Sequence, residues 1–157
     1  MANDTPAGDH GWVREQAIAL LARREHSQYE LRLKLWRRGC DDELVDAVID
    51  ELRDEDLLSD ARFAEAYVDS RARRGFGPVR IRGELQQRGV NDALAEEAVA
   101  NVECDWEASA AEQRRRRFGA ALPEDGRQRQ QQYRYLTNRG FTSDQIRTAL
   151  GDDADEA

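Results

Sequence analysis

Three segments of this 157-residue chain carry the same pattern: Leu35-Trp36-Arg37-Arg38-Gly39-Cys40-Asp41, Leu85-Gln86-Gln87-Arg88-Gly89-Val90-Asn91 and Leu136-Thr137-Asn138-Arg139-Gly140-Phe141-Thr142. Each copy reads leucine, two spacer residues, Arg-Gly, a small or apolar residue, and a residue that can cap a helix. The three glycines are 50 and 51 residues apart. A period near fifty, made of helix–turn–helix elements, predicts a repeat protein. Such proteins more often build binding surfaces than catalytic pockets.

Composition supports an all-α fold. Ala, Leu, Glu, Arg and Gln dominate while strand-forming residues are scarce, and 39% of the residues are apolar, too many for a disordered chain. We expect three tandem three-helix repeats, spanning residues 1–56, 57–104 and 105–157, the last with an acidic tail. A unit of about fifty residues buries little surface alone, so neighbouring repeats should share apolar faces in an elongated, curved molecule.

Local signals place the helices within the first two repeats. Ser27-Gln28-Tyr29-Glu30 reads as a capping box that opens a helix, and Gly39 ends that helix as a left-handed C-cap. Gly77 occupies the slot of Ser27, since each lies twelve residues before the glycine of its Arg-Gly pair. Pro78 then takes the first helical position, where its missing N–H costs nothing. Cys40 shares a slot with two apolar residues and is interpreted as part of the core.

The third repeat departs from the pattern at Gln132, where the other two repeats carry Leu31 and Ile81. We therefore expect the third repeat to be the least well packed, unless Tyr133 and Tyr135 compensate.

Charge is sorted along the chain, although the net charge is −8. Residues 71–90 carry six arginines against one acid, and residues 113–147 carry nine arginines against three acids. Residues 41–60 carry ten acids against one arginine, and residues 91–112 carry seven acids and no base. Two interpretations stay open. The charges are either solvated faces with ion pairs between helices, or a bipolar surface that meets phosphates or an acidic protein on one side and a basic protein surface on the other.

Several function classes are disfavoured. The turn at residues 38–41 resembles a helix-turn-helix, but the following helix is acidic and DNA phosphates would repel it. The two cysteines and two histidines have no metal-ligand spacing, and no phosphate-binding loop or hydrolase motif is present. No apolar run is long enough to span a membrane. We expect a soluble, cytoplasmic protein that is not an enzyme and needs no cofactor.

The central segment resembles the RecX family of bacterial regulatory proteins. The resemblance rests on Leu58 to Tyr67 and above all on residues 75–90, GFGPVRIRGELQQRGV, and it extends over roughly residues 14–150. It implies an all-helical protein of tandem three-helix repeats, without catalysis or cofactor. It further implies binding in the groove of the RecA filament on single-stranded DNA. There the protein would modulate ATPase and strand exchange, mostly by inhibition, in recombination, DNA repair and the SOS response.

Candidate contacts with the partner form a basic face of the second repeat: Arg71, Arg73, Arg74, Phe76, Arg80, Arg82 and Arg88. Arginine offers planar, bidentate donors to carboxylates and phosphates. Phe76, between two glycines, is either tucked into a core or an exposed anchor. Arg38, Arg88 and Arg139 share one slot, in which capping a helix C-terminus is an equal alternative to binding. The expected partner is the RecA filament, bound by a monomer, with weak direct contacts to single- or double-stranded DNA left open. A stand-alone nucleic-acid-binding repeat protein is the alternative function.

Overall fold

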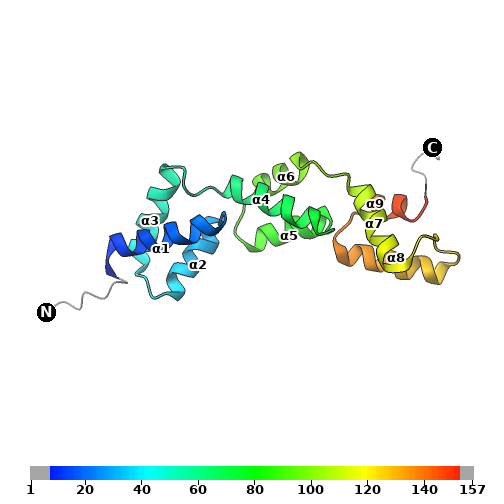
Figure 1. Cartoon of the computed structure of the whole chain (residues 1–157), viewed down its shortest axis with the longest axis horizontal. Helices are drawn as coiled ribbons and strands as arrows, with labels where there is room; N and C mark the ends of the chain where they lie inside the picture. The colour runs from blue at the N-terminus through cyan, green and yellow to red at the C-terminus, as the bar shows by residue number, and fades with distance from the viewer. Residues whose placement is uncertain (1–7, 153–157) are drawn as a thin grey trace. The chain divides into compact units, whose positions relative to one another are not determined.

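The computed structural model describes residues 8–152, which form nine α-helices and no strand (Figure 1). This confirms the all-α prediction. The helices are α1 (His10–Arg23), α2 (Gln28–Arg37), α3 (Asp42–Asp54), α4 (Asp60–Arg73), α5 (Pro78–Gln87), α6 (Asp92–Asn101), α7 (Trp106–Phe118), α8 (Gly126–Arg139) and α9 (Ser143–Ala149). The acidic tail was predicted for the last seven residues, 151–157, of which only Gly151 and Asp152 lie within the described part. The repeat boundaries near residues 56 and 104 stay a prediction.

The three Arg-Gly turns, at residues 38–39, 88–89 and 139–140, end α2, α5 and α8 in the same way. Gly39, Gly89 and Gly140 have φ angles of 81°, 78° and 99°, in the left-handed region that glycine adopts without strain. In each turn the glycine N–H binds a carbonyl three residues back, and the next residue's N–H binds the carbonyl of the repeat leucine, at 3.1–3.2 Å. These paired bonds form a Schellman motif, which satisfies carbonyls that a helix end otherwise leaves open.

Helix starts follow the predicted caps. Ser27 and Thr142 each form a complete capping box at the start of α2 and α9. Asp41 accepts a hydrogen bond from the first turn of α3, and Asn91 accepts one from Leu94 at the start of α6. Pro78 is the first residue of α5, as predicted. Among the described helices, all except α5 therefore begin at a side chain that accepts a hydrogen bond from an exposed N–H of the first turn, whereas α5 begins with a proline, which has no N–H to satisfy.

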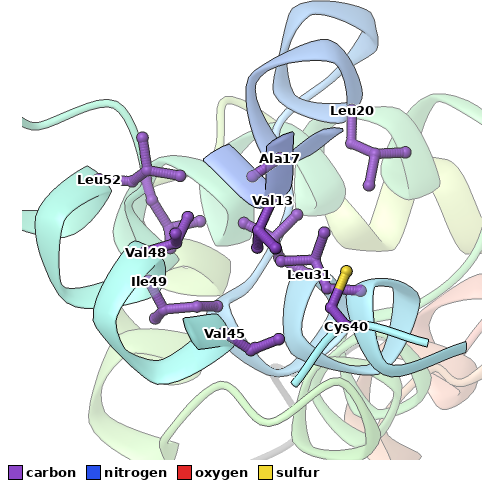
Figure 2. Packing of buried hydrophobic residues seen from close by; sticks show 11 residues of the cluster. Val13, Ala17, Leu20, Leu31, Cys40, Val45, Val48, Ile49 and Leu52 are labelled. Atoms are coloured by element: carbon purple, nitrogen blue, oxygen red, sulfur yellow. The ribbon is translucent and has the colours of Figure 1, made fainter. Parts of the chain in front are cut away.

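The core of the first repeat lies between α1, α2 and α3. Figure 2 shows side chains from these helices pointing toward one another, with the Cys40 sulfur among them. Cys40 is buried, which confirms its interpretation as a core residue. The buried positions of α3 recur every three or four residues, the period of a helix with one apolar face. They are Val45, Val48, Ile49 and Leu52.

The described chain divides into two compact units whose limits fall inside α4, α5 and α6 rather than between repeats. One unit contains residues 8–66 and 85–95, and the other contains residues 67–84 and 96–152. The second repeat thus contributes to both units. Each unit contains one contact between the start of one repeat's second helix and the Arg-Gly turn of the next repeat.

In the first unit, the start of α2 contacts the turn that follows α5. The Ser27 hydroxyl donates to the Arg88 carbonyl oxygen at 2.7 Å and accepts from the Glu30 N–H at 3.1 Å. Tyr29 packs over Gly89 so closely that a Cβ on this glycine would lie 2.4 Å from the Tyr29 Cβ. One serine therefore caps its own helix and satisfies the carbonyl of another.

In the second unit, the start of α5 contacts the turn that follows α8. The Gly77 N–H donates to the Arg139 carbonyl at 2.8 Å, and the Val79 N–H donates to the Gly140 carbonyl at 2.9 Å. A Cβ on Gly77 would lie 2.3 Å from the Gly140 carbonyl carbon, and one on Gly140 would lie 2.2 Å from the Arg80 Cβ. Both glycines are needed because two backbones meet here. The turn after α2 is different, since no atom of the described residues outside the turn itself lies within 4 Å of a Cβ placed on Gly39.

Two of the three turns, after α5 and after α8, have the start of another helix packed on them and are called the occupied turns. We predict that asparagine in place of the turn glycine destabilises the protein more at these two turns than at the open turn after α2. All three positions have a positive φ, which asparagine tolerates better than other residues, so backbone strain is matched. Gly89→Asn and Gly140→Asn add a side chain where none fits and should each lose about 2 kcal/mol more stability than Gly39→Asn. Urea unfolding measures the differences. Equal losses for the three variants would contradict the assignment of occupied and open turns.

Gln132 is buried in the third repeat. It is 6% exposed, and its Oε1 atom has no hydrogen-bond partner among the described residues. Tyr133 and Tyr135 pack at the edge of the third core, which contains Ala110, Leu136, Phe141, Ile146, Ala149 and Leu150. The position that departs from the repeat pattern thus places a polar atom without a hydrogen-bond partner in the third repeat, and Tyr133 and Tyr135 pack against the same core.

Gln132→Leu should stabilise the protein by about 1–2 kcal/mol, because it removes a buried unsatisfied acceptor and restores the apolar residue of the other two repeats. The matched control is Gln131→Leu, at an exposed neighbouring position, which should change stability by less than about 0.5 kcal/mol. Thermal unfolding of both variants checks this. A destabilised Gln132→Leu protein would show that the glutamine is satisfied in solution.

Candidate partner-binding surface

The structure separates the seven predicted contact residues. Six of them belong to one compact unit, whereas Arg88 belongs to the other. Arg71 and Arg73 lie in the last turn of α4, Arg74 directly follows the helix, and Phe76 lies in the connection to α5 at residues 74–77. Arg80 and Arg82 lie in the first half of α5. The structure therefore does not show these seven residues as one basic face.

Phe76 is the centre of an arginine cluster. The guanidinium carbons of Arg71, Arg139 and Arg80 lie 3.8, 4.1 and 4.6 Å from the centroid of its ring. A cation within about 6 Å of an aromatic ring is attracted by the ring's quadrupole. Phe76 is half-buried. Its ring is neither tucked into an apolar core nor an exposed anchor, the two alternatives that the sequence suggested, but is covered by guanidinium groups.

Glu84 neutralises part of this charge. Its carboxylate accepts two hydrogen bonds from Arg71, at 3.0 and 3.2 Å, and lies 3.9 Å from Arg80. The side chains of Arg71 and Glu84 are only 16% and 19% exposed. A paired, largely buried arginine of this kind fixes the ends of α4 and α5 relative to each other rather than offering free donors. We assign Arg71 a structural role, contrary to its selection as a contact.

Arg139 completes the cluster, and it was not among the predicted contacts. Its guanidinium donates to the Arg74 carbonyl at 2.8 Å and to the Gly75 carbonyl at 3.3 Å. These carbonyls end α4, so Arg139 caps a helix C-terminus, one of the two roles that its repeat slot suggested. The helix is not its own but one 65 residues earlier in the chain. The shared slot of the three arginines was the only sequence signal for this residue.

Arg73, Arg74 and Arg82 point to solvent. The Arg73 side chain is 79% exposed and pairs with Asp69 one turn earlier on α4, at 3.2 Å. Arg74 is exposed, and no carboxylate of the described residues pairs with it. Arg82 is 46% exposed and lies 3.9 Å from Glu96. Exposed ion pairs at such distances contribute little, so these guanidiniums remain open to an external carboxylate or phosphate.

Beside Arg82 lies a groove of about 480 Å³ within the same compact unit. Its walls are largely apolar, with Val79, Val99 and Trp106 among the lining residues. Val79 is 48% exposed. An arginine at the edge of an apolar groove is an arrangement suited to a protein partner.

The two thiols and the buried histidine have pKa values that burial has shifted toward the neutral form. Burial raises the pKa of the Cys40 and Cys104 thiols, which favours the unreactive protonated form. Burial lowers the pKa of His26, whose Nε2 atom lies 2.8 Å from the Lys34 ammonium and is placed to accept a hydrogen bond from it. Among residues 8–152, no three His, Cys, Asp or Glu side chains are arranged to hold a metal ion. No helix in that range is long and apolar enough to cross a bilayer.

Glu84→Gln should destabilise the protein by about 2 kcal/mol, because it leaves Arg71 largely buried without its counter-ion. The matched control is Glu96→Gln, whose side chain is 66% exposed and whose ion pair with Arg82 is long. This control should change stability by less than about 0.5 kcal/mol. Urea unfolding of the two variants measures both effects, and equal values would refute the structural role of the Arg71–Glu84 pair.

Comparison with known proteins covers nearly the whole chain. Family models described as the first, second and third three-helix domains of RecX match residues 14–52, 59–99 and 105–150. A protein of Halorhodospira halophila named "Regulatory protein RecX" is 50% identical over 146 residues, which are 92% of this chain and 91% of that protein. A protein of the same name from Pseudomonas savastanoi pv. phaseolicola is 47% identical over 154 residues, covering 96% and 97% of the two chains.

Solved structures agree on the fold. The crystal structure of RecX from Lactobacillus salivarius superposes with a TM-score of 0.75 at 23% identity, covering 90% of this chain and 94% of that one. A second crystal structure, of a regulatory protein RecX, gives a TM-score of 0.77 at 23% identity, covering 92% and 73%. At this identity the structures support the fold alone, whereas the three matching domain models and the relatives at 47–50% identity define the family. The chain belongs to the RecX family.

Proposed function

We propose that this protein is a non-enzymatic regulator, mostly an inhibitor, of the RecA recombinase. It binds the recombinase filament on single-stranded DNA and modulates ATPase and strand exchange, and so acts in recombination, DNA repair and the SOS response. The observation that carries the proposal is the match of all three repeats to RecX domains, in their RecX order. Relatives of nearly equal length are named regulatory proteins.

The exposed arginines at the end of α4 are proposed to contact the filament. Arg73 and Arg74 are adjacent, exposed and carried by a turn that Phe76 and Arg139 hold in place. Because the backbone that carries them is held, less conformational entropy is lost when these side chains bind a carboxylate or phosphate. Arg82 and the neighbouring apolar groove extend this contact surface along α5. Arg71 supports the surface from beneath, through Phe76 and Glu84, and Arg80 packs on the same ring while its side chain is 44% exposed.

The surface favours a protein or filament partner over free DNA. The net charge of −8 opposes tight binding to a polyanion, whereas a local cluster of arginines can still pair with carboxylates on a protein. We therefore propose that the protein acts on the filament as a monomer and binds DNA alone only weakly.

The test is the ATPase of RecA on single-stranded DNA, with this protein added below one copy per recombinase. Half-maximal inhibition should occur at a sub-stoichiometric ratio. The double variant Arg73→Glu/Arg74→Glu should need about tenfold more protein, because two attractive contacts become repulsive. The matched control Arg127→Glu/Arg134→Glu makes the same charge change on exposed positions of α8 and should inhibit as the unaltered protein does.

Circular dichroism and melting show that each variant is folded. Undiminished inhibition by Arg73→Glu/Arg74→Glu would exclude the α4 arginines as contacts but leave the function standing. An unaltered ATPase, together with tight and salt-dependent binding to DNA alone, would instead support a stand-alone nucleic-acid-binding protein.

A further inference from the structure

The Arg-Gly turn of the first repeat has the same backbone form as the two occupied turns, but no segment within residues 8–152 packs on it. Gly39 closes the same Schellman motif, through hydrogen bonds of 2.9 and 3.2 Å. No donor among the described residues bonds the carbonyl oxygens of Arg38 and Gly39, and both residues are exposed. In the occupied turns, Arg88 and Arg139 are partly buried. The carbonyl oxygens of the first turn are therefore placed like those of the occupied turns, but no helix start of the described residues donates to them.

The two occupied turns define what such a surface binds. Both hold the first residues of a short helix, and the residue that precedes that helix is small, Ser27 in one case and Gly77 in the other. In both contacts an O–H or N–H of this small residue donates to the arginine carbonyl, at 2.7 and 2.8 Å. The positive end of one helix dipole also meets the negative end of another, which adds to the attraction.

An exposed tryptophan marks the open turn. Trp36 belongs to the last turn of α2 and is 41% exposed, and its carbonyl accepts the Gly39 N–H. The same slot holds Gln86 and Thr137 beside the occupied turns. Contacts within one chain benefit from a high effective concentration, whereas a contact with a separate molecule needs additional binding energy. A large exposed aromatic side chain is the residue type that supplies it at protein interfaces.

We propose that the open turn, formed by Trp36, Arg38 and Gly39, is a docking site for a partner protein. The segment it receives is the N-terminus of a helix preceded by serine or glycine. The hydroxyl or backbone N–H of that residue donates to the Arg38 carbonyl, and the following turn of the helix packs over Gly39 and Trp36. This goes beyond the proposed function, because it names a second surface and the form of the segment that occupies it.

A second copy of this chain does not fit the site. The remaining second helix of a repeat, α8, has an aspartate before its first residue, at position 125. The Asp125 side chain is larger than the serine or glycine of the two occupied contacts, and its carboxylate, which accepts from the Gln128 N–H, cannot replace the Ser27 hydroxyl as a donor. Asp125 also lies fifteen residues before the glycine of its turn, instead of the twelve that separate Ser27 and Gly77 from theirs. The starts of α2 and α5 are occupied within the chain.

The probe is an acetylated peptide of residues 27–37, held helical by a hydrocarbon staple and labelled with a fluorophore, because an unconstrained helix of this length is marginal in water. Fluorescence anisotropy with the full-length protein should show saturable binding. Gly39→Asn should weaken it at least tenfold by placing a side chain where the helix packs. Gly126→Asn adds the same side chain at another glycine with open space and should leave it unchanged.

The hydrogen bond and the tryptophan are tested separately. A peptide with Ser27→Ala cannot donate to the Arg38 carbonyl and should bind about fivefold more weakly. The protein variant Trp36→Gln, which carries the residue of the second repeat, should also bind the unaltered peptide at least fivefold more weakly. Circular dichroism confirms that each protein variant is folded.

Equal binding of the peptide by the unaltered protein and by Gly39→Asn would overturn the proposal. Sedimentation velocity supplies the second criterion. Concentration-dependent self-association that Gly39→Asn abolishes would make a second copy the occupant and would overturn the assignment to a partner protein. A monomer at all concentrations, with peptide binding that depends on Gly39, supports it.

Discussion

Two helix ends that satisfy each other's hydrogen bonds are the interaction on which each compact unit depends. A helix leaves N–H groups open at its start and carbonyls open at its end, and burying either without a partner costs free energy. Here the N–H groups at the start of α5 donate to the carbonyls of the turn after α8, at 2.8 and 2.9 Å. A helix of ten residues is marginal alone, so such contacts largely determine whether it forms. The close approach requires Gly77 and Gly140, since a Cβ on either would lie less than 2.5 Å from the other backbone or from Arg80.

The same contact divides the arginines into two groups with different roles. It brings Arg139 against the end of α4, where its guanidinium binds two carbonyls and lies beside Phe76. Arg71 and Arg80 cover the same ring and share Glu84. The binding capacity of Arg71 and Arg139 is therefore used within the protein, whereas Arg80 is 44% exposed and its guanidinium stays partly accessible. Arg73 and Arg74, at the end of the same helix, remain exposed and are left for a partner. Residues 71–76 thus combine side chains that are held by internal contacts with two exposed arginines.

The parts of the structure that the sequence predicted are those that depend on local chemistry. The turn glycines, the capping box at Ser27, the helix cap at Thr142 and the proline at the start of α5 all act within a few residues, and each was found where expected. The roles of the arginines could not be predicted in this way. Whether Arg71 is free depends on Glu84, thirteen residues later, and whether Phe76 is exposed depends on Arg139, on another repeat. Likewise, the sequence around Ser27 predicts that it caps α2, but it does not predict that the Ser27 hydroxyl also donates to the Arg88 carbonyl, 61 residues away.

Hydrogen exchange at single amides tests this account most directly. The amides of Gly77 and Val79 lie at the start of a helix, where N–H groups normally exchange quickly because they have no acceptor. If they donate to the turn after α8, they should exchange at least about 100-fold more slowly than the amide of Arg127, which lies at the start of α8 and has no acceptor among the described residues. Protection at Gly77 and Val79 close to that of the core amides of Ile81 and Leu85 is the predicted result. Exchange as fast as that of Arg127 would contradict the contact between helix ends.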